Sequence, residues 1–372
     1  MSTRAGRPAI IDAAQVGLAI ALLVAGTAFL SLPRITASPA GSGAWVGVVG
    51  GAALALPLLW LLLALYLRHP GLTLVGTGRR LCGPFLGSLL GLALVAWSHF
   101  YLAVLVREFT GVFLVTFMPE TPLSVFVAVT VALLMYAAYQ GMEAIVRTAQ
   151  VFLPFIVVSL LVIVLGVLPR FKAGHLLPLS GNGWPGVGLA ALYTASPFAQ
   201  ALAATAFFPL LRQPREARPA LAVGLVAAAV TFLLLTTAEL GAFSAPVLDH
   251  LAFPTLSAAR LIRLGLFFER FEAGFMVVWF VLSFLKLALF FFFATATLAE
   301  VLGLATHKPL CLPGGLIVAF TAFFPENDGV TRHLLGLLYR YGLVAFAVPL
   351  FLLAVSWLAG RGSPTARKEG RR

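Results

Sequence analysis

The chain has 372 residues, of which 61% are hydrophobic and 10% are charged, and its formal net charge is +12. About a quarter of the residues of a soluble domain are charged, so this composition excludes an ordinary soluble protein and indicates an integral membrane protein. Its apolar segments are continuous rather than alternating, which excludes a transmembrane barrel, and the basic charge of a membrane protein gathers in its cytoplasmic loops, so we expect lipid and not nucleic acid around it.

Ten apolar segments along the chain have the length that a helix needs to cross a bilayer. They cover residues 11–32, 44–67, 86–113, 123–139, 151–168, 189–211, 221–240, 271–304, 310–324 and 341–358. The sequence therefore predicts an all-α membrane protein of about ten transmembrane helices. Five spans in each half would give the two halves opposite orientations, which is an inverted repeat.

We expect a single transmembrane domain over residues 1–372. Its first repeat covers about 10–168 and its second about 185–358, and a basic cytoplasmic tail covers 359–372. With both termini in the cytoplasm, fifteen lysines and arginines lie on the cytoplasmic side and nine on the other side. This excess favours that orientation.

The first span carries Gly26 and Thr27 where an ordinary span would carry large apolar residues. A break there would expose backbone N–H groups at the start of a second half-helix, and that end carries a partial positive charge suited to a carboxylate. The alternative is that these small residues only allow close helix packing. A matching break in the second half of the chain favours a ligand site over packing.

That second break lies in the sixth span, where Pro197 cannot donate a backbone hydrogen bond. Ser196 and Gln200 offer polar atoms beside it, and Phe198 offers an apolar wall. The alternative is a simple proline kink. Two interrupted spans in corresponding positions predict a ligand site near the middle of the membrane.

Lys286 lies near the middle of the eighth span, too far from either surface for its side chain to reach water. A charged lysine at this depth costs at least about 2.5 kcal/mol, so it should face a cavity or a partner. Three interpretations remain open: an ion pair with a carboxylate such as Glu239, a neutral lysine, or a functional charge. We favour the functional charge, either facing a ligand or replacing a coupling cation.

The third span contains a polar and aromatic patch. Trp97 and Tyr101 are four residues apart and can line a pocket together, whereas His99 is only a minor candidate for a proton relay. Outside the spans, residues 253–262 have helical apolar spacing and could cover the mouth of a pocket, and residues 139–147 suggest a short cytoplasmic surface helix.

The sequence contains no HExxH, no GxxxxGK[ST] and no Cys/His cluster at the spacing of metal ligands. We therefore expect neither an enzyme nor a cofactor nor a metal site.

Several short motifs together resemble the endospore germination permeases, which are the B subunits of spore germinant receptors. They are Leu-Ser-Leu-Pro-Arg at 30–34, Val-Arg-Glu-Phe at 106–109, Pro-Phe at 197–198, Phe-Pro-Thr at 253–255, Phe-Glu-Arg-Phe-Glu at 268–272 and Trp279. The resemblance covers nearly the whole chain. It implies a helical bundle of the leucine-transporter kind, in the amino acid–polyamine–organocation superfamily, with helices 1 and 6 interrupted.

The resemblance also implies residence in the inner membrane of a spore, beside an A subunit and a lipoprotein C subunit. Family members are thought to sense germinants, often amino acids, in a pocket between spans one, three, six and eight. Carried over by motif, the walls of that pocket are Gly26, Thr27, Trp97, Phe198, Gln200 and Lys286. Many members have an acid where this chain has Gln200, and this departure bears on how an amine would be recognised.

Our leading hypothesis is therefore a germinant-sensing receptor subunit that binds a small amino acid or similar zwitterion. A proton-coupled amino acid transporter and a channel-like conduit for small solutes are the alternatives.

Overall fold

The computed structural model describes residues 11–26, 28–262 and 271–359, and within these ranges it is all-helical. The elements are α1 (Ala13–Ala25), α2 (Ala28–Ala40), α3 (Ala44–Arg68), α4 (Leu74–Phe117), α5 (Leu123–Gln140), α6 (Met142–Val167), α7 (Trp184–Ala195), a 3₁₀ segment (Ser196–Ala206), α8 (Ala217–Phe243), α9 (Ala245–His250), α10 (Pro254–Leu261), α11 (Phe271–Val301), α12 (Cys311–Ala322), α13 (Asp328–Tyr341), a 3₁₀ segment (Gly342–Phe346) and α14 (Ala347–Leu358). Among the described residues, eight helices are long and apolar enough to cross a membrane, and α1 and 308–322 are shorter apolar helices.

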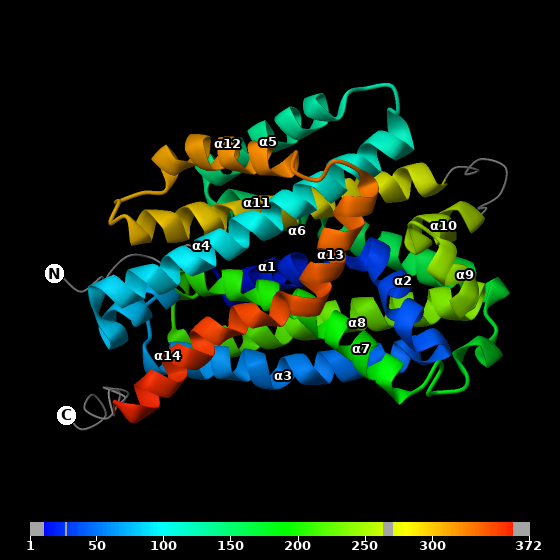
Figure 1. Ribbon diagram of the computed structural model, residues 1–372, viewed down its shortest axis with the longest axis horizontal. Helices are drawn as coiled ribbons and strands as arrows, with labels where there is room; N and C mark the ends of the chain where they lie inside the picture. Colours follow the sequence, from blue (N-terminus) through cyan, green and yellow to red (C-terminus); the bar gives the residue numbers. More distant parts are fainter. Residues whose placement is uncertain (1–10, 27, 263–270, 360–372) are drawn as a thin grey trace.

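The long helices run along one axis of the bundle. The start of α1 and the end of α14 lie at one end, whereas α2, α9 and α10 lie at the other (Figure 1). We call the latter the α10 end. α10 contacts α2, α6, α8 and α11, so it packs across several spans there. Residues 253–262 are thus mainly helical, as the spacing predicted, and their role as a cover stays a prediction.

The first span is divided where the sequence predicted. α1 ends at Ala25 with Gly26 as its C-cap, and α2 begins at Ala28. The sixth span also changes character, because α7 ends at Ala195 and the chain continues as a 3₁₀ segment over Ser196–Ala206. α1 contacts this 3₁₀ segment, so the two irregular stretches lie near each other inside the bundle.

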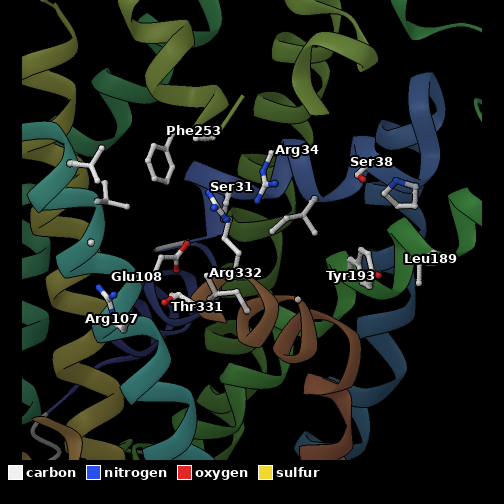
Figure 2. Close-up of a pocket in the computed structure, with 18 residues that line it drawn as sticks. Ser31, Arg34, Ser38, Arg107, Glu108, Leu189, Tyr193, Phe253, Thr331 and Arg332 are labelled. Atoms are coloured by element: carbon white, nitrogen blue, oxygen red, sulfur yellow. The ribbon is translucent and has the colours of Figure 1, made fainter. Parts of the chain in front are cut away.

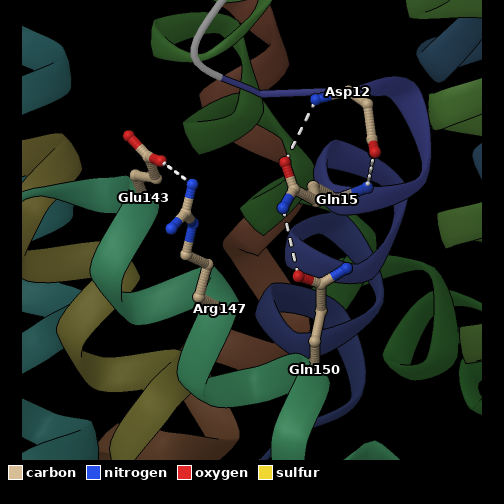
Figure 3. Close-up of polar contacts among 5 residues, drawn as sticks. All are labelled: Asp12, Gln15, Glu143, Arg147 and Gln150. Carbon is tan, nitrogen blue, oxygen red and sulfur yellow. Dashed lines mark hydrogen bonds and ion pairs between the residues drawn. The ribbon is translucent and has the colours of Figure 1, made fainter.

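The start of α1 is fixed by a capping box. The Asp12 side chain accepts a hydrogen bond from the Gln15 backbone N–H at 2.7 Å, and the Gln15 side chain accepts one from the Asp12 N–H at 3.1 Å. The Gln15 amide also donates to Gln150 on α6 at 3.0 Å (Figure 3). These bonds satisfy orphan N–H groups of the first turn and tie α1 to α6.

The third span agrees with the prediction, because α4 is interrupted at Gly83 and the helix that follows begins close to residue 86; the φ of Gly83, 87°, is the left-handed region that glycine allows. Two other boundaries differ from the prediction. Residues 139–147 are not a separate surface helix, because α6 begins at Met142 directly after the turn at Gly141. Glu143 and Arg147 do form the ion pair expected from their spacing (Figure 3).

The second difference is in the tenth span, which was predicted to begin at residue 341. The chain is already helical from Asp328, as α13, and a 3₁₀ segment joins α13 to α14. α13 mixes polar and apolar residues, so a search for continuous apolar segments does not find it.

The outer surface of the long helices is apolar. On α6, the side chains of Val151, Phe155, Val158 and Leu165 are all exposed. Apolar faces of this extent indicate contact with lipid. The interior holds large aromatic side chains that are fully buried, among them Phe198, Phe207, Phe232, Trp279 and Phe290, and it also holds Lys286.

α1 and α8 pack closely through two glycines. A Cβ atom on Gly224 would clash with the Ile20 side chain and would lie 2.9 Å from the carbonyl oxygen of Gly17. We predict that Gly224→Ala lowers the free energy of unfolding by about 1–3 kcal/mol, because overpacking displaces neighbouring atoms. Thermal unfolding of the purified protein in detergent measures the loss.

The matched control is Gly188→Ala, because a Cβ atom on Gly188 would meet nothing within 4 Å. Equal melting temperatures for the two variants would contradict this description of the α1–α8 contact.

Candidate functional site

The break in the first span lies against the middle of α11. A Cβ atom on Gly26 would lie 2.8 Å from both Cβ and Cδ of Lys286, so the lysine side chain contacts the glycine backbone directly. The Ser283 hydroxyl donates to the Gly26 carbonyl oxygen at 3.2 Å. We call this contact of Gly26, Ser283 and Lys286 the junction. Only glycine at position 26 leaves room for the lysine.

Lys286 is fully buried, and its electrostatic neighbour is Glu108 on α4. Glu239, which the ion-pair interpretation suggested as a partner, instead faces Thr255 of α10. The structure therefore replaces Glu239 with Glu108 as the carboxylate that offsets the lysine charge. A buried charge needs such a partner because desolvation is costly.

An aromatic cluster lies one helical turn from Lys286. Phe290 of α11 packs against Trp97 and Tyr101 of α4, with ring centroids 5.5 and 5.6 Å away. The Gln200 amide, from the 3₁₀ segment, donates to the Tyr101 hydroxyl at 3.0 Å. The cluster thus joins spans three, six and eight, which are three of the four spans between which the resemblance implied a pocket.

Other predicted residues lie elsewhere. Phe198 is fully buried and packs edge-on against Phe232 of α8, with centroids 6.0 Å apart. Ser196 lies beside Gly342, a residue of the 3₁₀ segment that joins α13 to α14. Thr27 lies outside the described residues. The structure therefore brings Gly26 together with Lys286, and Gln200 with the two aromatic residues of α4, but it directs Phe198 and Ser196 toward other neighbours.

The His99 side chain has a hydrogen-bond partner within its own helix, because its Nδ1 atom lies 3.0 Å from the Val95 carbonyl oxygen. Nothing in its contacts adds support for a proton relay.

A cavity of about 500 Å³ opens at the α10 end of the bundle. α2, α4, α7 and α13 all contribute to its wall, and Phe253 lines it just before α10 begins (Figure 2). Its charged lining includes Arg34, Glu108 and Arg332. Because Glu108 interacts electrostatically with both Lys286 and Arg34, one carboxylate connects the cavity with the junction.

Sequence reasoning did not assign this cavity. Glu108 was not singled out as a site residue, although it is an acid within the predicted third span, and that position was the available signal. Arg332 falls between the predicted spans 310–324 and 341–358, and only the helical start at Asp328 puts it on the same part of α13 as Thr331 and Leu335, which also line the cavity.

Most of the chain matches a known protein family. A family model described as "Spore germination protein" matches residues 10–329. Among individual relatives, the chain is 24% identical over 357 residues to spore germination protein YndE of Bacillus subtilis (strain 168), covering 95% of this chain and 98% of that protein.

Solved structures share the fold. A Na⁺-coupled sialic acid symporter superposes with a TM-score of 0.68 at 10% sequence identity, covering 92% of this chain and 79% of the symporter. MhsT in complex with L-phenylalanine superposes with a TM-score of 0.68 at 15% identity, covering 94% and 100% of the two chains. The chain therefore has the leucine-transporter fold, with its inverted repeat and its interrupted first and sixth spans.

The hydrogen bond between Gln200 and Tyr101 allows a direct test of the aromatic cluster. Tyr101→Phe leaves the buried Gln200 amide without its acceptor, so we predict a loss of about 1–3 kcal/mol in the free energy of unfolding. The double variant Tyr101→Phe/Gln200→Leu should lose less than the sum of the two single variants, since it removes both partners. Thermal unfolding in detergent measures the cycle, and strict additivity would rule out the bond.

Proposed function

This chain belongs to the spore germination protein family, and on that premise we propose that it is a germinant-sensing receptor subunit that binds a small amino acid or similar zwitterion at the junction. The family and the fold make it a germination-related, multi-pass membrane protein. We propose in addition that it binds an amino acid and that this binding signals to partner subunits.

The observation that carries the proposal is the contact of Lys286 with Gly26. It places a buried positive charge at a break between two half-helices, which is where an anionic ligand group is stabilised in transporters built from inverted repeats. A ligand carboxylate would take the lysine as its partner. The aromatic cluster around Phe290, one turn away, would contact the side chain of the ligand.

The neighbours in fold support the ligand class. MhsT was solved with L-phenylalanine, so this architecture can hold an amino acid. In this chain Gln200, not an acid, comes from the sixth span, and its amide donates to Tyr101. A ligand ammonium group would therefore be recognised by carbonyl and amide oxygens rather than by a carboxylate at that position.

We place the protein in the inner membrane of the spore, with both termini in the cytoplasm, beside an A subunit and a lipoprotein C subunit. The family match supports this setting. Binding would shift the population between two arrangements of the divided first span, and the partner subunits would respond to that shift. Such a mechanism needs no catalysis.

A proton-coupled amino acid transporter is the second candidate, because the fold is shared with a solved symporter. The purified chain in proteoliposomes distinguishes the two functions. A sensor should bind an amino acid without accumulating it, whereas uptake against a concentration gradient, driven by an imposed pH gradient, would establish transport and exclude a purely sensory role.

The binding site is tested by two substitutions at the junction. Gly26→Leu displaces Lys286, and Lys286→Met removes its charge, so each should weaken binding at least about ten-fold. Binding is measured by screening single amino acids for thermal stabilisation of the protein in nanodiscs and then titrating the strongest one.

The controls are Gly274→Leu, where a Cβ atom meets nothing within 4 Å, and Lys308→Met, which removes an exposed lysine near Tyr139. Unchanged affinity in both junction variants, with folding intact, would remove the junction from the ligand site.

A further inference from the structure

The cavity at the α10 end holds more positive than negative charge. Among the residues that the structure describes, three arginines line it, Arg34, Arg107 and Arg332, against a single acid, Glu108. That carboxylate also interacts electrostatically with Lys286 and Arg34, so its negative charge is shared between cations. The cavity therefore has a positive potential, which favours an anion over a neutral or cationic solute.

Two of the arginines reach the cavity from different helices. Arg34 comes from α2 and Arg332 from α13, and Figure 2 shows their guanidinium groups converging near Ser31, with the Glu108 carboxylate to one side. The Nε atom of Arg34 is buried and has no hydrogen-bond partner among the described residues. Two converging guanidinium groups repel each other, and a carboxylate between them removes the repulsion and satisfies the planar donors.

The remaining lining suits an organic molecule. The hydroxyl groups of Ser38, Thr331 and Tyr193 supply further polar contacts, while Val112 and Leu335 provide apolar surface. The volume of about 500 Å³ lies within the range of small-molecule pockets. Apolar surface beside the arginines favours a ligand with a carbon skeleton over a bare inorganic anion.

We propose that this cavity is a second binding site, separate from the junction, and that it takes a small organic acid through its carboxylate groups. Arg34 and Arg332 hold the carboxylates, and Val112 and Leu335 contact the carbon chain. Glu108 lies between the two sites and interacts with a cation of each, Arg34 in the cavity and Lys286 at the junction. An anion on Arg34 therefore changes the electrostatic surroundings of the carboxylate that Lys286 depends on.

The probe for this site is succinate, which has two carboxylates and no ammonium group and so differs from the zwitterion proposed for the junction. Calorimetric titration of the full chain in uncharged lipid nanodiscs at low ionic strength should show binding. Succinamide, its uncharged analogue, should bind at least about ten-fold more weakly, because it lacks charge-assisted hydrogen bonds.

Arg34→Gln and Arg332→Gln should each weaken succinate binding about ten-fold or more. Arg332 is exposed, so its variant is expected to fold normally, and Arg34→Lys serves as a second variant that keeps the charge at position 34 but loses the planar fork. The matched control is Arg340→Gln, which removes an exposed arginine from α13 that does not line the cavity. Its affinity should stay within about two-fold of the unmodified chain.

Three results would overturn the proposal. They are no measurable succinate binding, succinate binding that both cavity variants leave unchanged, and inorganic phosphate binding as tightly as succinate. The last would make the cavity a general anion site. None of these results bears on amino acid binding at the junction, which the Gly26 and Lys286 variants test separately.

Discussion

The contact between Lys286 and the backbone of Gly26 is the constraint on which the rest of the site depends. A lysine buried at the centre of a membrane bundle needs space, a partner charge and polar neighbours. Gly26 leaves room for the lysine side chain, Glu108 supplies the opposite charge, and the Ser283 hydroxyl donates a hydrogen bond to the Gly26 carbonyl oxygen. These contacts hold spans one, three and eight in one arrangement. In the proposed sensor, a ligand that competes for Lys286 would release the three spans from that arrangement.

Most of the fold was predictable because a membrane imposes one strong rule. Each span must satisfy its backbone hydrogen bonds internally, so long apolar segments are helices. The end of α1 at Ala25 was visible in the small residues that follow it, and Pro197 marked the 3₁₀ segment. The start of α13 at Asp328 was missed, because an amphipathic helix gives no continuous apolar signal.

The site was predictable only in part, because side-chain direction depends on packing. The i,i+4 spacing of Trp97 and Tyr101 correctly placed them together, and Lys286 stood out by its charge. The direction of Phe198 toward α8 depends on the 3₁₀ backbone, which sequence patterns do not specify. Glu108 could not be identified as the carboxylate near Lys286, since no local sequence pattern indicates which of several acids lies close to a given lysine in the fold.

Nitrogen NMR of lysine side chains gives the most direct measurement. The chain has only four lysines, so a sample labelled at Nζ has few signals, and Lys286→Met assigns the relevant one. Adding the amino acid that stabilises the protein most should shift the Lys286 signal and leave that of the exposed Lys308 in place. A Lys286 signal that stays unchanged while the ligand saturates the protein would contradict binding at the junction.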